Sequence, residues 1–228
     1  MRNAARLLIL VALLAGCRGG ACPGTAPPDL DRGHALLDPD GAEFQVAPPP
    51  SYDVLFETSE GDVRIRVFTE WAPLGAQRFY NLVRTGFYDG SRFFRVLPGF
   101  AVQFGANGTP QVDRIWSEQV LEDEPRRADN ETGTLAFAMA GPGTRSTQLF
   151  FNYRVNEALD DQGFAPIGRI VEGADALHRL NSDYGEPQPL GRGPSWECIM
   201  EKGNGYMRAR YPDLDSIVRA TVLTGVTN

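Results

Sequence analysis

The chain has 228 residues, of which 42% are hydrophobic and 10% aromatic, which suits one folded domain with a sizeable core and excludes disorder throughout. Its 25 glycines and 17 prolines are scattered along the sequence, which favours a fold rich in turns and strands over a helical bundle. The net charge of −7 argues against nucleic acid as a partner, because an acidic surface repels phosphate backbones.

The first sixteen residues have the pattern of an export signal. Two arginines precede an apolar run over residues 7–14, which is too short for a membrane-spanning helix, since that takes roughly 20 apolar residues. The sequence LAGC at 14–17 resembles the bacterial lipobox, in which Cys17 would become the lipid-bearing first residue. We therefore expect residues 1–16 to be a signal peptide and the protein to be a lipoprotein on the periplasmic face of a bacterial membrane. The outer membrane is favoured because no aspartate follows the cysteine, and a secreted soluble protein is the alternative.

Residues 17–51 are rich in proline and glycine and show little periodicity. Beyond the lipidated cysteine they predict a flexible tether, with an r.m.s. reach of about 30 Å if it behaves as a coil. Two further cysteines, Cys22 and Cys198, are one candidate disulfide pair in an oxidising compartment. Two unpaired thiols are the alternative, because the sequence does not show whether the side chains approach each other.

From residue 52 the pattern becomes that of a β-rich domain. Alternation over 52–58 and 63–68 predicts a hairpin with one buried face, and helical spacing over 71–88 predicts an amphipathic helix. The further elements expected in chain order are strands at 92–97, 100–104, 134–140, 148–153 and 165–171, a loop at 106–131, a helix at 173–181 and a closing strand at 216–223. This order favours a mainly β fold in which helices cap a closed antiparallel barrel.

Most catalytic chemistries lack their residues in this sequence. It holds two histidines, His34 and His178, and no Cys-x-x-Cys pair, so neither a metal site nor a cofactor is expected. A Gly-x-Ser-x-Gly elbow and a Walker loop are missing too, and an acidic run such as 122–124 is typical of a solvated surface. What remains is Arg95 among apolar neighbours and a second, mostly apolar cluster at 137–151.

These segments resemble the cyclophilin-type peptidyl-prolyl cis-trans isomerases. The resemblance rests on RFFRVLPGFAVQFG at 92–105, GTLAFAMAGPGTRSTQLFF at 133–151 and LDDQGFAPIGRIVEG at 159–173, three motifs in the family's order. It implies an eight-stranded antiparallel barrel capped by two helices over residues 52–182, and an isomerase of prolyl bonds. Residues 183–228 lie beyond it, and we expect them to form an extension with a short helix and a closing strand.

The resemblance also implies which residues form the site. Arg95 and Gln103 take the catalytic positions. The proline pocket and its groove fall on Phe100, Ala101, Ala138, Met139, Gln148, Phe150, Leu159 and Phe164. The sequence departs from the family's pattern at Ala101, Phe104, Ala106, Met139, Leu149 and Ala158, which bears on the peptide preference of the groove.

More than one interpretation stays open. The chain either isomerises prolyl bonds in exported proteins or is a proline-peptide-binding holdase with little isomerase activity, which the changes at 104, 139 and 149 favour. A blander interpretation makes Arg95 an ordinary strand residue that reaches solvent or pairs with an acid. The expected partners are proline-containing segments of unfolded or exported proteins and, through the N-terminal lipid, a membrane. We expect a monomer.

Overall fold

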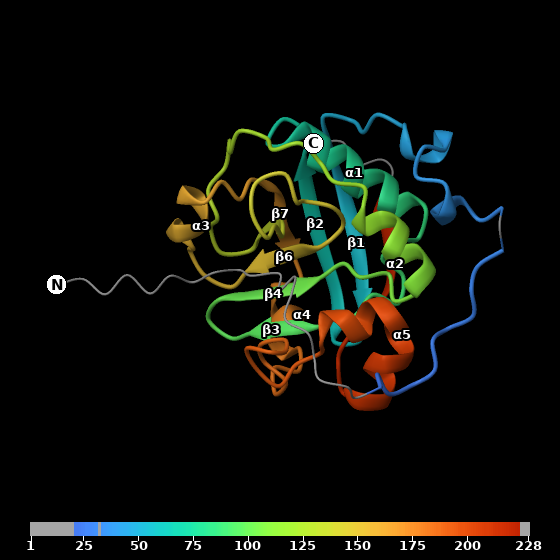
Figure 1. The fold of residues 1–228 in the computed structure, drawn as a ribbon. Coiled ribbons are helices and arrows are strands. Elements are labelled where there is room, and N and C mark those ends of the chain that lie inside the picture. The colour runs from blue at the N-terminus through green and yellow to red at the C-terminus, as the bar shows by residue number, and fades with distance from the viewer. Residues whose placement is uncertain (1–20, 32, 224–228) are drawn as a thin grey trace.

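In the computed structural model, which describes residues 21–31 and 33–223, eight strands pair into one sheet that curls into a barrel (Figure 1). Their bounds are Ser51–Thr58 (β1), Gly61–Phe68 (β2), Arg95–Leu97 (β3), Ala101–Phe104 (β4), Thr134–Phe137 (β5), Leu149–Asn152 (β6), Pro166–Glu172 (β7) and Ile217–Leu223 (β8). The strand order is β3-β4-β6-β5-β7-β2-β1-β8, and every neighbouring pair is antiparallel. The prediction of a mainly β, eight-stranded antiparallel barrel is confirmed.

The two outer strands, β3 and β8, meet at one end of the barrel. Phe93, just before β3, donates its backbone N–H to the carbonyl of Asp215 at 3.0 Å. Ile217 donates to Ser91 at 2.8 Å, and Gly90 donates to Ile217 at 2.7 Å. These bonds join the start of β8 to the segment that leads into β3, so closure is made at that end.

The core of the barrel is built from the inward-facing residues of the strands. In β2, Val63, Ile65 and Val67 are fully buried and alternate with more exposed residues, as the twofold period of a strand requires. The rings of Phe104 and Phe151 stack inside, with centroids 5.6 Å apart. The alternation seen in the sequence therefore fixes which face of the sheet is buried.

The described residues form five α-helices: Pro73–Arg84 (α1), Pro110–Ser117 (α2), Glu157–Asp161 (α3), Ala174–Arg179 (α4) and Trp196–Arg210 (α5). The two predicted capping helices are present, since α1 packs against β8 and α4 packs against β2. The predicted helix of the C-terminal extension corresponds to α5, which is interrupted at Gly203 by a φ of +53°. Within the described part of the chain, every helix is too short or too polar to cross a bilayer.

The helix α2 was not predicted, because the sequence favours a loop over 106–131. Pro110 begins the helix at a position where its missing N–H costs nothing. Val112 and Trp116 lie one turn apart and are both buried, which anchors the helix against the core and α5. The prediction of an unbroken loop is therefore wrong. The sequence did not indicate the helix because two apolar residues in eight give a weak helical period, and the flanking residues are typical of turns.

Asp113 of α2 gives the folded protein a pH dependence. Its carboxylate accepts the N–H of Asn107 at 2.7 Å and of Gly108 at 2.9 Å, yet burial dominates and raises its pKa to about 7. A raised folded-state pKa means that the folded protein binds a proton more tightly than the unfolded chain. The stability gained from this proton is present below pH about 4 and is lost as the pH rises to about 7.

We expect the free energy of unfolding to fall between pH 4 and 7 by about 1.4 kcal/mol per pH unit from this one group. Asp113→Asn stays neutral at every pH, so its stability should fall less steeply over the same range. Urea unfolding at several pH values measures both slopes. Parallel curves for the wild type and the variant would contradict the prediction.

The segment predicted as a flexible tether packs against the barrel where the structure describes it. Between residues 33 and 50 it forms two short 3-10 helices, Ala35–Leu37 (η1) and Ala42–Phe44 (η2). Leu36 and Phe44 are buried in the main core. Figure 1 shows this blue segment running along one side of the molecule, from α5 to α1 and α2. Residues 21–31 and 33–50 are therefore part of the folded body, and the tether prediction is wrong for them.

Three further links hold the N-terminal segment in place. The indole Nε1 of Trp116 donates to the carbonyl of Leu36 at 2.8 Å, and Asn81 donates to the carbonyl of Phe44 at 2.8 Å. Cys22 forms a disulfide with Cys198 of α5, so the candidate pair is joined in the structure. Two buried apolar side chains, Leu36 and Phe44, were enough to dock an otherwise mostly exposed proline-rich segment, and the residues they contact lie far away in the sequence. Cys17, the predicted lipidation site, lies outside the described residues.

Removing the disulfide should destabilise the protein. The bond spans 176 residues, and a crosslink over a long loop restricts the unfolded chain. For Cys22→Ser combined with Cys198→Ser we expect a loss of roughly 2 to 4 kcal/mol in the free energy of unfolding. Guanidinium unfolding with and without a thiol reductant provides the measurement. The reductant should destabilise the wild type and leave the double-serine variant unchanged; equal stability of the oxidised wild type and the variant would refute the prediction.

Candidate functional site

The β3-β4 hairpin supplies the polar residues of the candidate site. Its turn contains Gly99 with a φ of +71°, a conformation that glycine adopts without strain. Arg95 pairs with Gln103 across the hairpin, so both side chains project from the same face. Arg95 Nη1 donates to Gln103 Oε1 at 3.3 Å, and Gln103 Nε2 donates to Gln148 Oε1 at 2.8 Å. The three polar residues that the resemblance assigns to the site thus form one hydrogen-bonded row.

An apolar cluster, separate from the main core, lies beside this row. Its buried members are Phe100, Ala101, Ala136, Ala138, Met139, Phe150, Leu159 and Phe164. The rings of Phe150 and Phe164 meet edge to face with centroids 5.7 Å apart. The guanidinium carbon of Arg95 lies 5.6 Å from the centroid of the Phe100 ring. The structure therefore brings together all seven apolar residues that the resemblance assigns to the pocket and groove, and sets the arginine against them.

The cluster has one member that the sequence did not suggest. Ala136 lies two residues before Ala138, and strand alternation turns both toward the same side. The twofold alternation of a strand places Ala136 on the same face as Ala138, but Ala136 is not among the residues that the family resemblance assigns to the site. Its small side chain leaves room for the larger rings of the cluster.

A hollow of about 260 Å³ opens next to the cluster. Its walls include Phe100 and Leu159, which also belong to the cluster, together with the loop and helix at 154–158 and Gln162. Ala158 lies in the wall at the position where the resemblance places a tryptophan in many relatives. A methyl group there leaves the hollow wider than an indole would.

Several departures from the family's pattern lie away from the cluster. Phe104 and Leu149 are fully buried in the main core of the barrel. Ala106 packs with residues of α5 in a third cluster. Only Ala101 and Met139 belong to the apolar cluster itself. The expectation that Phe104 and Leu149 alter the groove is therefore wrong, because strand alternation turns both side chains inward.

Glu186, from the segment that follows α4, is a site residue that the sequence did not reveal. Its two carboxylate oxygens lie 2.7 Å from Nε and 2.7 Å from Nη2 of Arg95. Arg95 is thus paired with an acid, as the blander interpretation expected, while it also contacts Gln103 and faces Phe100. The two partners are 91 positions apart, and no spacing or motif connects them.

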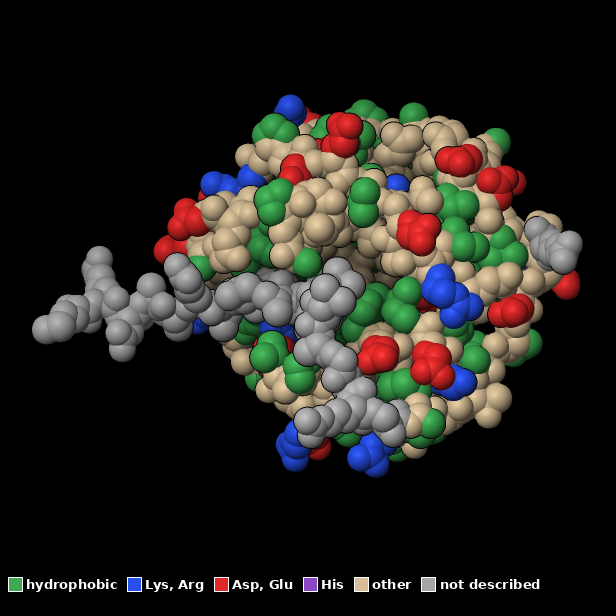
Figure 2. Space-filling view, viewed as in Figure 1, with side chains coloured by type: hydrophobic (Ala, Val, Ile, Leu, Met, Phe, Trp, Pro, Cys, Tyr) green, Lys and Arg blue, Asp and Glu red, His purple; other side chains and the backbone are tan. Residues whose placement is uncertain are grey.

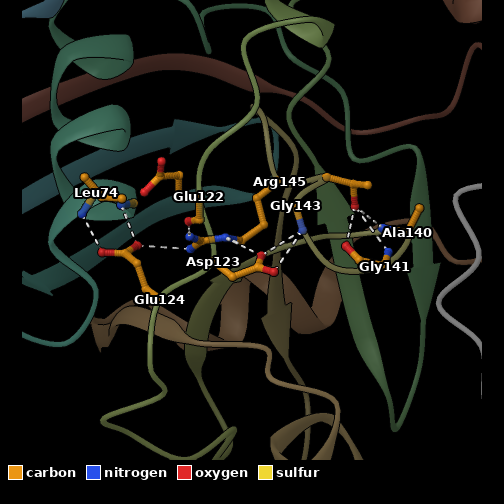
Figure 3. Close-up of polar contacts among 10 residues, drawn as sticks. Leu74, Glu122, Asp123, Glu124, Ala140, Gly141, Gly143 and Arg145 are labelled. Carbon is orange, nitrogen blue, oxygen red and sulfur yellow. Dashed lines mark hydrogen bonds and ion pairs between the residues drawn. The ribbon is translucent and has the colours of Figure 1, made fainter.

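A buried arginine fixes the turn at 140–145, which links two parts of the cluster (Figure 3). Arg145 is only 2% exposed, and its Nη1 lies 3.1 Å from Glu124 Oε2. Its Nη2 donates to the carbonyl of Glu122. The Asp123 carboxylate accepts the N–H of Gly143 at 2.9 and 3.0 Å. Glu122 and Asp123 are exposed, as expected of a solvated surface, yet the Asp123 and Glu124 carboxylates and the Glu122 carbonyl also hold the turn.

The same network reaches the first capping helix. Glu124 accepts the backbone N–H groups of Leu74 at 2.6 Å and Gly75 at 3.0 Å, at the start of α1 (Figure 3). A carboxylate at this end also complements the helix dipole. One acidic side chain thus connects Arg145, the turn of the cluster and α1.

Arg78 of α1 braces the turn from the other side. Its Nη1 donates to the carbonyls of Gln119 at 2.6 Å and Ser146 at 3.3 Å. Burial lowers the pKa of the Arg78 guanidinium, although an arginine remains protonated at any ordinary pH. The segment between Met139 and Gln148 is therefore held by the buried Arg145 and the half-buried Arg78 before any peptide binds.

Figure 2 shows acidic and basic side chains spread over the face that Figure 1 presents. Over residues 21–31 and 33–223, no group of three or more His, Cys, Asp or Glu side chains is placed to hold a metal ion. What the candidate site offers is a cation paired with a carboxylate, two amides and an apolar surface.

Comparisons with known proteins agree on one family. A sequence model described as "Cyclophilin type peptidyl-prolyl cis-trans isomerase/CLD" matches residues 53–193, more than half of the chain. A peptidyl-prolyl cis-trans isomerase of Acinetobacter baylyi is 29% identical over 150 residues, covering 62% of this chain and 80% of the relative. The Schizosaccharomyces pombe peptidyl-prolyl cis-trans isomerase ppi1 is 35% identical over 131 residues, covering 56% and 84%.

A solved structure agrees on the fold. A cyclophilin type peptidyl-prolyl cis-trans isomerase of Cryptosporidium parvum superposes with a TM-score of 0.58 at 19% identity, covering 77% of this chain and 99% of that one. A structure of the same protein in the presence of the dipeptide Ala-Pro gives a TM-score of 0.57 at 19% identity, covering 76% and 99%. At this identity the likeness concerns the path of the backbone.

Proposed function

This chain belongs to the cyclophilin-type peptidyl-prolyl cis-trans isomerases, and from that premise we propose that it uses Arg95 and the apolar cluster to isomerise prolyl bonds in exported proteins. Its isomerase activity is that of the family; the residues, the mechanism and the clients are the proposal. The Cryptosporidium parvum relative solved with an Ala-Pro dipeptide supports proline-containing peptide segments as substrates.

The reaction requires no covalent bond to be broken. A prolyl amide rotates slowly because resonance gives its C–N bond a barrier of about 18 to 20 kcal/mol. In the twisted state the nitrogen lone pair is no longer shared with the carbonyl, so the nitrogen accepts a hydrogen bond better than in the planar state. A donor aimed at this nitrogen binds the twisted state preferentially, and only such differential binding lowers a barrier.

Arg95 is the proposed donor. A hydrogen bond from a charged group is worth about 1.5 to 3 kcal/mol, or roughly 10- to 150-fold in rate. The remainder would come from rings such as Phe100 and Phe150 holding the proline, while Gln103 and Gln148 orient the peptide carbonyls. Arg95 alone is therefore insufficient for a fast isomerase, and the pocket supplies the remaining acceleration by holding and orienting the proline.

One observation carries this proposal. The guanidinium of Arg95 lies against the Phe100 ring and in the same hydrogen-bonded row as Gln103 and Gln148. A strand arginine that merely reached solvent would be exposed, but this side chain is 8% exposed. The cation is thus held beside the apolar surface that would receive a proline ring.

A protease-coupled assay on a short Ala-Pro peptide tests the proposal. We expect the purified protein to accelerate the slow cis-to-trans phase in proportion to its concentration. The alternative is a holdase that binds proline peptides with little turnover, and Met139 in the apolar cluster is its remaining support. Peptide binding seen by NMR at the cluster without acceleration of the slow phase would establish the holdase.

For localisation we propose a lipoprotein anchored through Cys17 on the periplasmic face of a bacterial membrane, with the outer membrane favoured. The support is the sequence of residues 1–17. Radiolabelled palmitate should be incorporated by the wild type and not by Cys17→Ser. A variant that still fractionates with membranes, or a wild type without label, would leave the secreted soluble form as the better account.

A further inference from the structure

We infer that Glu186 is a positioning residue for the isomerase reaction: it holds the guanidinium of Arg95 in the orientation that faces the apolar cluster. This inference rests on the proposed role of Arg95. It concerns a residue from the segment between α4 and α5, so it also gives part of the C-terminal extension a function.

Arg95 and Glu186 form a bidentate ion pair, which we call the clamp. One carboxylate oxygen of Glu186 lies 2.7 Å from Nε of Arg95 and the other lies 2.7 Å from Nη2. Two parallel bonds fix the plane of a guanidinium as well as its place, which a single contact does not. Arg95 is 8% exposed and Glu186 is 32% exposed, so the pair is partly shielded from water.

Among the residues that the structure describes, the clamp leaves two N–H groups of Arg95 without a partner and therefore available to a substrate. A guanidinium carries five N–H groups. Glu186 takes one on Nε and one on Nη2, and Gln103 takes one on Nη1. The remaining two, one on each terminal nitrogen, have the orientation that the clamp sets. The carboxylate therefore occupies the Nε edge of the guanidinium and leaves Nη1 beside Gln103.

The segment that carries Glu186 is itself braced. The carbonyl of Glu186 accepts the N–H of Gly193 at 2.8 Å, and the carbonyl of Gly193 accepts the hydroxyl of Tyr211 at 2.9 Å. A Cβ on Gly191 would come within 2.4 Å of the Glu186 carbonyl oxygen, so only glycine allows this close approach. Tyr211 directly follows α5, which the disulfide at Cys198 ties to the N-terminal segment. The carboxylate is thus held by several packed elements.

Preorganisation explains why such a clamp would matter. An unrestrained arginine samples many rotamers, and this freedom is lost each time the side chain is fixed on a substrate. A displacement of about 1 Å at a reacting group can cost roughly 100-fold in rate. The opposite effect, in which the carboxylate neutralises the arginine and competes with the substrate, predicts that removing it raises the rate. The two effects therefore differ in the sign of the change.

The test compares Glu186→Gln and Glu186→Ala with the wild type by NMR exchange on an Ala-Pro peptide, which yields the on-enzyme isomerisation rate and the affinity separately. We expect the rate to fall about 3- to 30-fold in the alanine variant and less in the glutamine variant, which keeps one acceptor. The affinity should change by less than about threefold, because Glu186 belongs neither to the apolar cluster nor to the lining of the adjoining hollow. Glu201→Gln is the matched control, since Glu201 is exposed on α5 of the same extension and pairs with Lys202.

A double-mutant cycle shows whether Glu186 acts through Arg95. In an Arg95→Ala background, Glu186→Ala should change the rate by less than about twofold. A Glu186→Gln rate equal to or above that of the wild type overturns the inference, as does a loss of the same size in both backgrounds. If Arg95→Ala alone leaves the rate unchanged, the proposed mechanism fails and the inference falls with it, so the two failures are distinguishable. The thermal midpoint of each variant separates a loss of folding from a loss of positioning.

Discussion

Arg95→Ala should lower kcat/KM for a short Ala-Pro peptide by about 10- to 1,000-fold. The lower limit corresponds to the loss of one charge-assisted hydrogen bond to the prolyl nitrogen. The upper limit adds the disorder of Gln103, which Arg95 contacts through Nη1. A protease-coupled assay at several enzyme concentrations measures the ratio, with the uncatalysed rate subtracted. Most of the loss should appear in kcat, because the interaction is stronger in the twisted state than in the ground state.

Two companion variants sharpen this result. Arg95→Lys keeps the charge but cannot form the two-pronged contact with Glu186, so we expect it to recover little of the activity. Arg219→Ala is the control. It removes an exposed arginine from β8, a strand that contributes no residue to the apolar cluster, and it should retain wild-type rates. Equal rates for Arg95→Ala and the wild type would remove Arg95 from the mechanism.

Arg145→Ala should cost roughly 3 to 5 kcal/mol of the free energy of unfolding. The variant leaves the Glu124 carboxylate, which is 6% exposed, without its cation. It also removes the donor to the Glu122 carbonyl. Removing one partner of a buried ion pair is far more damaging than the pair's net contribution, because the remaining charge stays desolvated. Urea unfolding with the disulfide intact measures the loss.

The matched control is an exposed ion pair. Arg179 is 54% exposed and lies 3.6 Å from a carboxylate oxygen of Glu60, so Arg179→Ala should cost no more than about 1 kcal/mol. A loss below about 1 kcal/mol for Arg145→Ala as well would mean that Glu124 is satisfied by the N–H groups of α1 alone. Isomerase activity of Arg145→Ala should also fall, since the turn at 140–145 links Met139 to Gln148.

Local patterns were enough to predict the barrel. The alternation in β2 and the helical spacing of α1 are properties of neighbouring residues, and the structure has both elements where they were expected. The site was predicted to the extent that short motifs carry it: Arg95 with Phe100, and Met139 with Phe150, lie in two continuous segments. Their convergence in one place followed from the pairing of β4 with β6.

What the sequence did not reveal depends on long-range contacts. Glu186 reaches Arg95 across 91 positions, and its role follows from how the extension packs. In the sequence, Leu36 and Phe44 are isolated apolar residues in a proline-rich segment. Only the structure shows that they pack against core residues far away in the chain. The helix α2 could not be recognised from the sequence because only two of its large apolar residues, Val112 and Trp116, are buried at helical spacing. In each case the deciding partner lay outside any window in which periodicity is visible.

If the protein is acylated at Cys17 as proposed, the disulfide would also limit how far the enzyme stands from the bilayer. In the acylated protein proposed above, five peptide steps separate the lipid-bearing Cys17 from Cys22, which α5 holds in the folded body. Even fully extended, five residues span at most about 18 Å. The α5 end of the isomerase would then lie close to the lipid headgroups. The enzyme would bind its clients at the membrane surface and not at a distance from it.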